Sequence, residues 1–148
     1  GSGLWNDTTR NDFYSSPTIA HVDNDGLPDL IGGDFDNHTI LAYHGIDGTP
    51  LWETIILDNT RAQIFLVMAD IDGDGEIEVL VLGKYRNPFS VNAKTGDVEW
   101  TFNIEIPFGQ PTVWDIDQDG IAEILLSAGG GKHTSWSKHL GPDSRPEL

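Results

Sequence analysis

Short apolar runs alternate with turn residues along most of the chain, and this pattern recurs about every 45 residues. In each interval a β-branched or apolar run precedes a polar loop, and a second apolar run follows that loop. Gly, Asp and Pro lie between the runs, which is the spacing of short strands and turns rather than of helices. A third run and a fourth complete each unit, and the fourth contains Trp52 or Trp100. The pattern predicts an all-β chain made of four-stranded repeats.

The strand pattern divides the chain into three repeats in permuted phase. These repeats span residues 16–57, 61–104 and 108–148. We interpret residues 4–15 as the fourth strand of a preceding or closing blade, because Trp5 precedes Trp52 by nearly one repeat length. Residues 1–3 (Gly-Ser-Gly) are typical of a cloning remnant, and the third strand of the last repeat is expected to begin at Trp136. Four short strands in about 45 residues match one β-propeller blade, and rings usually contain 4–8 blades. We therefore expect either a partial propeller or a ring closed by oligomerisation.

The polar loop between the first two runs of each repeat is acidic and follows one nine-residue pattern. The three loops are residues 21–29, 70–78 and 115–123. Acids occupy positions 1, 3, 5 and 9 and glycine occupies position 6, except that His21 takes position 1 of the first loop. Twelve of the chain's 24 acidic residues lie in these 27 positions. Because two carboxylates 5 Å apart repel by roughly 3 kcal/mol at an effective dielectric constant of 20, such loops are costly without a cation.

Oxygen donors in this arrangement are typical of a Ca²⁺ site, since that ion takes six to eight oxygens and the carbonyl of position 7 can supply one. The ligands predicted for the second loop are Asp70, Asp72, Asp74, the Glu76 carbonyl and Glu78. Those predicted for the third loop are Asp115, Asp117, Asp119, the Ile121 carbonyl and Glu123. Those predicted for the first loop are Asp23, Asp25, the Leu27 carbonyl and Asp29. The first site is expected to be the weakest, either degenerate or completed by water, because imidazole is a poor ligand for calcium.

Two other kinds of loop have similar sequences. An EF-hand requires a bidentate Glu at position 12, but the chain has Gly32, Val81 or Leu126 there, and a β-run follows instead of a helix. Simple acidic hairpin turns are the second alternative, because Asp-Gly is a common turn dipeptide. Three loops in phase, each with a closing acid, favour the metal sites.

These residues give the chain a resemblance to a known family. Each repeat resembles the FG-GAP, or VCBS-type, repeat of integrin α-subunit propellers: Phe108-Gly109 precedes the third loop, and Gly32-Gly33, Gly83 and Gly129-Gly130 close the following strands. The resemblance implies a β-propeller that binds calcium through DxDxDGxxD loops, but it does not specify a biological role. Similar loops occur in fungal propeller lectins, rhamnogalacturonan lyases and many bacterial surface proteins. Asn92–Trp100 also resembles the tryptophan-docking end of a quinoprotein blade, which implies that the repeated tryptophans pack between blades. Exposed tryptophans that stack on sugars are the alternative.

Charge and composition narrow the functions that remain. The formal net charge of −16 argues against nucleic acids and anionic membrane surfaces as partners. The chain has no cysteine, which excludes disulfides and thiolate sites, and no apolar run is long enough to insert into a membrane. We expect a non-enzymatic recognition or adhesion module with structural calcium, located outside the cell or on its surface. Its expected partners are an extracellular protein or glycan and, to complete a ring, a second copy. The alternative is a propeller fragment of a polysaccharide lyase or another carbohydrate-active enzyme, and no catalytic residue is assigned.

Overall fold

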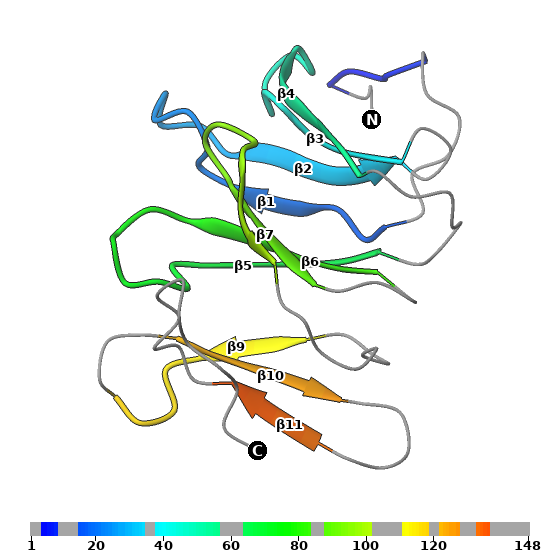
Figure 1. The fold of residues 1–148 in the computed structure, drawn as a ribbon. Helices are drawn as coiled ribbons and strands as arrows, with labels where there is room; N and C mark the ends of the chain where they lie inside the picture. Colours follow the sequence, from blue (N-terminus) through cyan, green and yellow to red (C-terminus); the bar gives the residue numbers. More distant parts are fainter. Residues whose placement is uncertain are drawn as a thin grey trace.

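The computed structural model shows three antiparallel β-sheets stacked one upon another (Figure 1). The described residues are 4–8, 15–34, 38–56, 64–83, 88–101, 111–118, 122–127 and 133–136. Every regular element in these ranges is a strand, so the all-β prediction is confirmed. None of these ranges contains a helix long and apolar enough to span a membrane.

The first and second sheets each contain four strands joined in sequence order. The first sheet consists of β1 (Thr18–Ala20), β2 (Asp29–Asp34), β3 (Thr39–Tyr43) and β4 (Pro50–Ile55). The second consists of β5 (Ile64–Ala69), β6 (Glu78–Gly83), β7 (Phe89–Asn92) and β8 (Val98–Thr101). Both sheets are meanders in which each strand pairs with the next, as the repeat pattern predicts.

The third sheet has three strands in the described part of the chain. They are β9 (Thr112–Trp114), β10 (Glu123–Ser127) and β11 (His133–Trp136), with β10 in the centre. The sequence placed the start of the third strand at Trp136, and this was wrong, because β11 ends there instead. The ladder explains the difference: Ile124 of β10 pairs with Trp136, and Ser127 pairs with His133.

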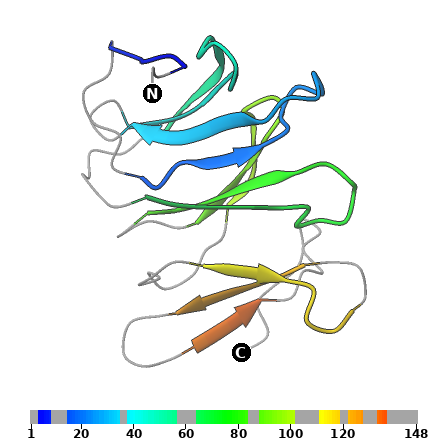
Figure 2. The same cartoon turned by 180° about the vertical axis from the view of Figure 1, so that it is seen from behind.

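Two apolar clusters hold the three sheets together. The first lies between the first and second sheets, where Ile31 and Ile40 meet Val79 and Val91, all 0% exposed. The second lies between the second and third sheets and includes Ile71, Leu80, Leu82 and Ile124. All six residues of β6 are buried because this central strand is covered on both faces. The first strands β1, β5 and β9 are neighbours in turn (Figure 2).

A tryptophan of β4 fastens this outer strand to the turn of the next repeat. The Trp52 indole Nε1 donates to the Ala93 carbonyl at 2.7 Å. Its ring lies over Gly96, where φ is +79° and an added Cβ would stand 2.8 Å from the indole. The packing role predicted for this tryptophan is confirmed.

Residues 4–8 lie against the first sheet in the same way. Trp5 Nε1 donates to the Gly45 carbonyl at 2.9 Å, and its ring lies over Gly48, where φ is +73°. Tyr43 adds a tilted ring contact and donates its hydroxyl proton to Asp7 at 2.6 Å. Residues 4–8 form no strand, but they occupy the position on the first sheet that β4 occupies on the second.

Candidate metal centres

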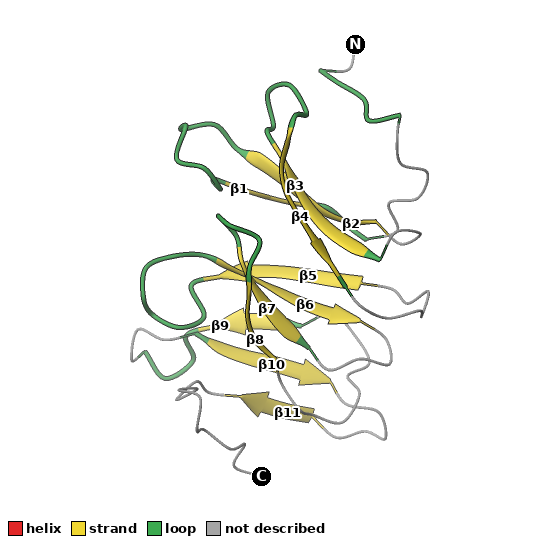
Figure 3. Ribbon diagram, turned by 45° about the horizontal axis from the view of Figure 1, so that its top comes forward, coloured by secondary structure: helices red, strands yellow, loops and turns green. Residues whose placement is uncertain are grey.

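The three acidic loops lie at the same end of the stacked sheets (Figure 3). Their backbones share left-handed residues, at position 4 in all three loops and at position 6 in the first two. At position 4, φ is 65° in Asn24, 72° in Gly73 and 63° in Gln118. At position 6, φ is 84° in Gly26 and 90° in Gly75. The glycine required by the sequence pattern thus serves a conformation that side chains rarely adopt.

The acid at position 9 closes each loop through the same hydrogen bond. One oxygen of Asp29, Glu78 or Glu123 accepts the amide proton of position 2 in its own loop. The distances are 2.9 Å from Val22 N, 2.6 Å from Ile71 N and 2.6 Å from Ile116 N. These three carboxylates are almost fully buried, and each stands where the acidic loop meets the following strand. The acid at position 9 therefore holds the loop closed with one oxygen, and its second oxygen is left for another partner.

In the second loop that second oxygen meets further carboxylates. Asp70, Asp72 and Glu78 each offer an oxygen, and these atoms all lie within 4.8 Å of one another. Glu78 is 1% exposed, and its Oε1 is buried with no hydrogen-bond partner among the described residues. A buried acceptor without a donor is costly, so this oxygen fits a cation ligand. The donor set is all oxygen, which suits Ca²⁺ better than softer metals.

The electrostatics at Glu78 disfavour its ionised form. Burial raises the pKa of Glu78 to about 7, and the negative charges of Glu99, Asp74 and Asp70 add to the rise. The hydrogen bond from Ile71 N acts in the opposite direction. A bound cation would reverse this balance, because it favours the ionised carboxylate.

The remaining ligands predicted for this loop are placed differently. Asp74 lies outside the convergent group, and its Oδ1 accepts the Glu76 amide proton at 2.9 Å. Asp70 accepts from Gly73 N at 2.6 Å and from Gly75 N at 3.0 Å, so the position-1 acid also shapes the turn. The structure thus brings together three of the predicted side chains, and Asp74 orders the loop.

The third loop repeats this arrangement. Asp115, Asp117 and Glu123 offer oxygens that all lie within 4.8 Å of one another. Asp119 and Ile121, the other two ligands predicted there, lie outside the described residues.

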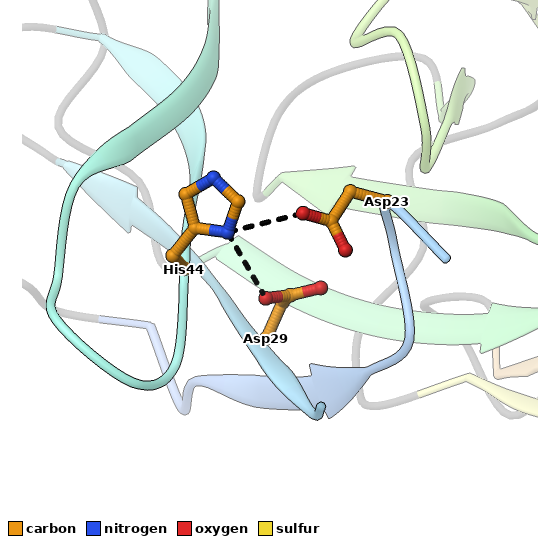
Figure 4. A group of neighbouring side chains, drawn as sticks. All are labelled: Asp23, Asp29 and His44. Atoms are coloured by element: carbon orange, nitrogen blue, oxygen red, sulfur yellow. Dashed lines mark ion pairs between the residues drawn. The ribbon is translucent and has the colours of Figure 1, made fainter. Parts of the chain in front are cut away.

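A histidine from outside the first loop enters its acidic group. His44, which follows β3, places its Nδ1 3.1 Å from Asp23 Oδ2 and 3.9 Å from Asp29 Oδ1 (Figure 4). Gly45 N donates to the same Asp29 oxygen at 3.3 Å. The oxygen that is unpartnered in Glu78 is therefore engaged in Asp29.

The other predicted ligands of the first loop are also engaged. His21 Nδ1 lies 3.0 Å from the Leu27 carbonyl, the oxygen predicted to bind the ion from position 7. Asp25 lies outside the convergent group and accepts the Leu27 amide proton at 2.7 Å. The first loop therefore has the same backbone frame as the second but offers fewer open donors.

A known protein family matches the segment that contains the first two loops. Residues 21–81, which contain both loops and the strands around them, match the sequence model of the FG-GAP-like repeat family. The chain contains an FG-GAP-like repeat. The resemblance inferred from the glycines and acidic loops is thus confirmed for this segment. No curated protein sequence matches the chain.

Two solved structures align with most of the chain. The V. cholerae biofilm matrix protein Bap1 has a TM-score of 0.59 and 21% identity over 90% of this chain. BamB from Moraxella catarrhalis has a TM-score of 0.44 and 15% identity over 90% of this chain. The chain spans 28% of the length of Bap1 and 49% of that of BamB. The likeness to Bap1 shows that the stacked sheets around the FG-GAP-like repeat form a known fold.

His44 is the site residue that the sequence did not reveal. It lies outside the nine-residue loop, in the turn after β3, so the spacing of the acids gives no sign of it. The equivalent residue of the second repeat is Asn92, whose side chain accepts amide protons from Lys94 and Thr95 of its own turn. Comparing the two repeats position by position is the one sequence signal that singles out His44 as a difference near the metal loop.

Proposed function

We propose that the chain is a calcium-binding repeat module of β-propeller type, in which the ion is structural and the role is recognition or adhesion outside the cell. The observation that carries the proposal is the second loop. There Asp70, Asp72 and Glu78 converge around a buried Glu78 oxygen that lacks a hydrogen-bond donor. The FG-GAP-like match of residues 21–81 supports the same assignment.

The ion would act on the hairpin between two adjacent strands. Asp70 and Asp72 follow β5, and Glu78 begins β6. When bound, calcium would supply the positive charge that lets these carboxylates remain ionised together. The loop carboxylates would then hold the two strand ends in register, and Glu78 would keep its bond to Ile71 N.

The arrangement of the sheets supports the propeller assignment. Each sheet is a meander, successive sheets stack face to face, and their first strands β1, β5 and β9 are neighbours. This is how propeller blades succeed one another around an axis. Trp5 and Trp52, nearly one repeat length apart, make the same indole contact with the turn of the repeat that follows.

A location outside the cell is supported by three features. A fold neighbour is named as a biofilm matrix protein, the chain has no cysteine to be oxidised, and calcium loops of moderate affinity fill at the calcium concentrations found there. The polysaccharide lyase alternative is not favoured, because every convergent acidic group among the described residues belongs to one of the repeated loops. The expected partner is a protein or a glycan.

Thermal unfolding in calcium and in EDTA tests the proposal. A site with a Kd of 10 µM contributes about 2.7 kcal/mol at 1 mM calcium. Two such sites would contribute roughly 5 kcal/mol, or about 10–20 °C in Tm for a chain of this size. Magnesium should restore little of this, because it prefers a smaller octahedral shell. Identical melting curves in the two buffers would show that the loops are acidic turns without a metal.

Variants assign the effect to individual loops. Asp72→Ala and Asp117→Ala should each abolish most of one site's calcium-dependent gain in Tm. Asp23→Ala should change that gain less, because His44 and His21 already engage donors of the first loop. A screen of glycans and extracellular proteins, run in calcium and in EDTA, then tests the recognition role.

A further inference from the structure

The two outermost faces of the stack expose apolar residues whose counterparts inside the stack are buried or partly buried. On the third sheet these are Trp114, Ile116 and Leu125, which are 73%, 58% and 42% exposed. We call them the open face of the third sheet. Ile116 and Leu125 occupy the loop and strand positions that Ile71 and Leu80, both 0% exposed, occupy in the second repeat.

The first sheet exposes its other face, the one that points away from the second sheet. Ile19 is 68% exposed and lies with Leu30 in a groove of about 340 Å³ that Leu4 and Trp5 also line. We call this groove the open face of the first sheet. Ile19 and Leu30 correspond to Met68 and Val79, which the first apolar cluster covers inside the stack.

These two open faces correspond to the two sides of the interfaces that already join the sheets within the chain. In the first internal interface, the face that carries Val22 and Ile31 packs on the face that carries Met68 and Val79. In the second, the face with Ile71 and Leu80 packs on the face with Val113 and Ile124. The open face of the third sheet corresponds to the face that carries Val22 and Ile31 in the first sheet. The open face of the first sheet corresponds to the face that carries Met68 and Val79 in the second sheet. Placing one on the other would therefore repeat an interface that the molecule already makes twice.

Residues 4–8 indicate how the two faces would meet. They already lie on the first sheet where a fourth strand belongs, with Trp5 over Gly48 as Trp52 is over Gly96. The third sheet shows three strands in the described ranges, with β11 at its edge next to the position of a fourth. A third sheet seated on the groove would bring β11 beside residues 4–8.

We propose that the chain associates head to tail with a second copy, the open face of the third sheet of one copy covering the open face of the first sheet of the other. The interface is heterologous, because different surfaces of the two copies meet. It goes beyond the calcium proposal and does not depend on it, since strand residues form both faces. Calcium would aid association only by reducing repulsion between acidic loops brought side by side.

Light scattering coupled to size exclusion measures the first consequence. The wild-type chain should have a mass of at least twice 16.2 kDa, and Ile19→Asp or Trp114→Asp should each reduce it to that of one chain. Val98→Asp is the matched control, because Val98 is 50% exposed but lies on β8 of the middle sheet, away from both open faces. A wild type that is monomeric at every concentration, or an oligomer that survives both substitutions, overturns the proposal. Calcium-dependent melting of such a monomer would leave the calcium proposal standing.

Mixing the two monomeric variants tests the head-to-tail geometry. Ile19→Asp retains an intact third-sheet face, and Trp114→Asp retains an intact first-sheet groove, so an equimolar mixture should form a dimer with one interface. Failure of the mixture to associate would mean that the interface is isologous and would overturn the proposal.

Cross-linking tests the same interface without introducing a charge, so a loss of stability in the aspartate variants does not affect its result. The chain has no cysteine, so Ile19→Cys and Trp114→Cys introduce single thiols on separate copies. Their internal counterparts, Met68 and Ala20, pack in the same apolar cluster. A short bis-maleimide should join the two variants to each other in high yield, and Val98→Cys should replace neither of them. Equal yields with Val98→Cys would overturn the proposal.

Discussion

Glu78 is a buried carboxylate with an unpartnered oxygen, so the calcium-free protein should lose stability as the pH rises. Its pKa is raised from the ordinary value of 4.5 to about 7, mainly by burial. Below pH 4.5 the group is protonated in both the folded and the unfolded chain, and its contribution to stability is complete. Between these two values the unfolded chain releases the proton while the folded chain retains it, so the free energy of unfolding decreases with pH. Above pH 7 both states are ionised and the decrease ends.

The size of this decrease follows from the two pKa values. A difference of 2.5 units between them corresponds to roughly 3 kcal/mol, at 1.36 kcal/mol per unit. Glu78→Gln cannot ionise and keeps an acceptor for Ile71 N, so this part of the pH dependence should disappear. Calcium should reverse the trend in the wild type, because the ion binds the carboxylate and displaces the proton.

Urea denaturation at several pH values between 5 and 8 in EDTA measures these free energies. Glu76→Gln is the matched control, because it removes one charge from an exposed position of the same loop. We expect the wild type and Glu76→Gln to lose stability steeply towards pH 7 and Glu78→Gln to lose far less. Parallel pH profiles for the wild type and Glu78→Gln would refute the argument that Glu78 is held in an unfavourable site.

Three further substitutions test other contacts. Trp52→Phe removes the indole proton donated to the Ala93 carbonyl and should lower the free energy of unfolding by about 1 kcal/mol or more; an unchanged urea midpoint would contradict this. Gly75→Ala should cost about 1–2 kcal/mol, because φ is +90° there and no atom lies within 4 Å of an added Cβ; a stabilised variant would show that the loop relaxes. His21→Asp combined with His44→Asn should rebuild the first loop on the pattern of the second and add one calcium ion to the number bound, which titration calorimetry measures; an unchanged stoichiometry would mean that His21 and His44 do not block that loop.

The local features of the fold could be predicted because short-range chemistry determines them. Strand spacing and turn residues located β1 to β10, and the glycine at position 6 marked a left-handed turn that few other residues allow. The closing acids at position 9 were also predicted, although their hydrogen bonds to position 2 became visible only in the structure. The start of β11 was missed because Gly129–Gly131 and Lys132 gave no apolar pattern from which to place it.

The differences among the three loops depend on contacts between segments distant in sequence. His44 follows β3 and comes beside Asp29 through the pairing of β2 with β3, which nothing in the spacing of the acids encodes. Asn92, which pairs with Glu78 across the ladder, accepts with its side chain from its own turn, and Glu78 Oε1 has no hydrogen-bond partner among the described residues. Residue type predicted which loops could hold an ion, but only the packing of the neighbouring turn shows which donors remain open.

Trp5 and Trp52 each lie over a glycine of the repeat that follows, and this has a consequence for how such chains can grow. Trp52 lies in the first repeat and Gly96 in the second, just as Trp5 precedes the repeat that contains Gly48. A gene duplication that inserts one whole repeat length therefore supplies both the tryptophan and the glycine of a new contact, whatever the phase at which the DNA is joined. Replacement by an unrelated repeat succeeds only if its turn also offers a bare glycine. The tryptophan–glycine contact is thus compatible with lengthening of the chain by duplication of its own repeats. The same contact makes it difficult to replace one repeat with an unrelated one.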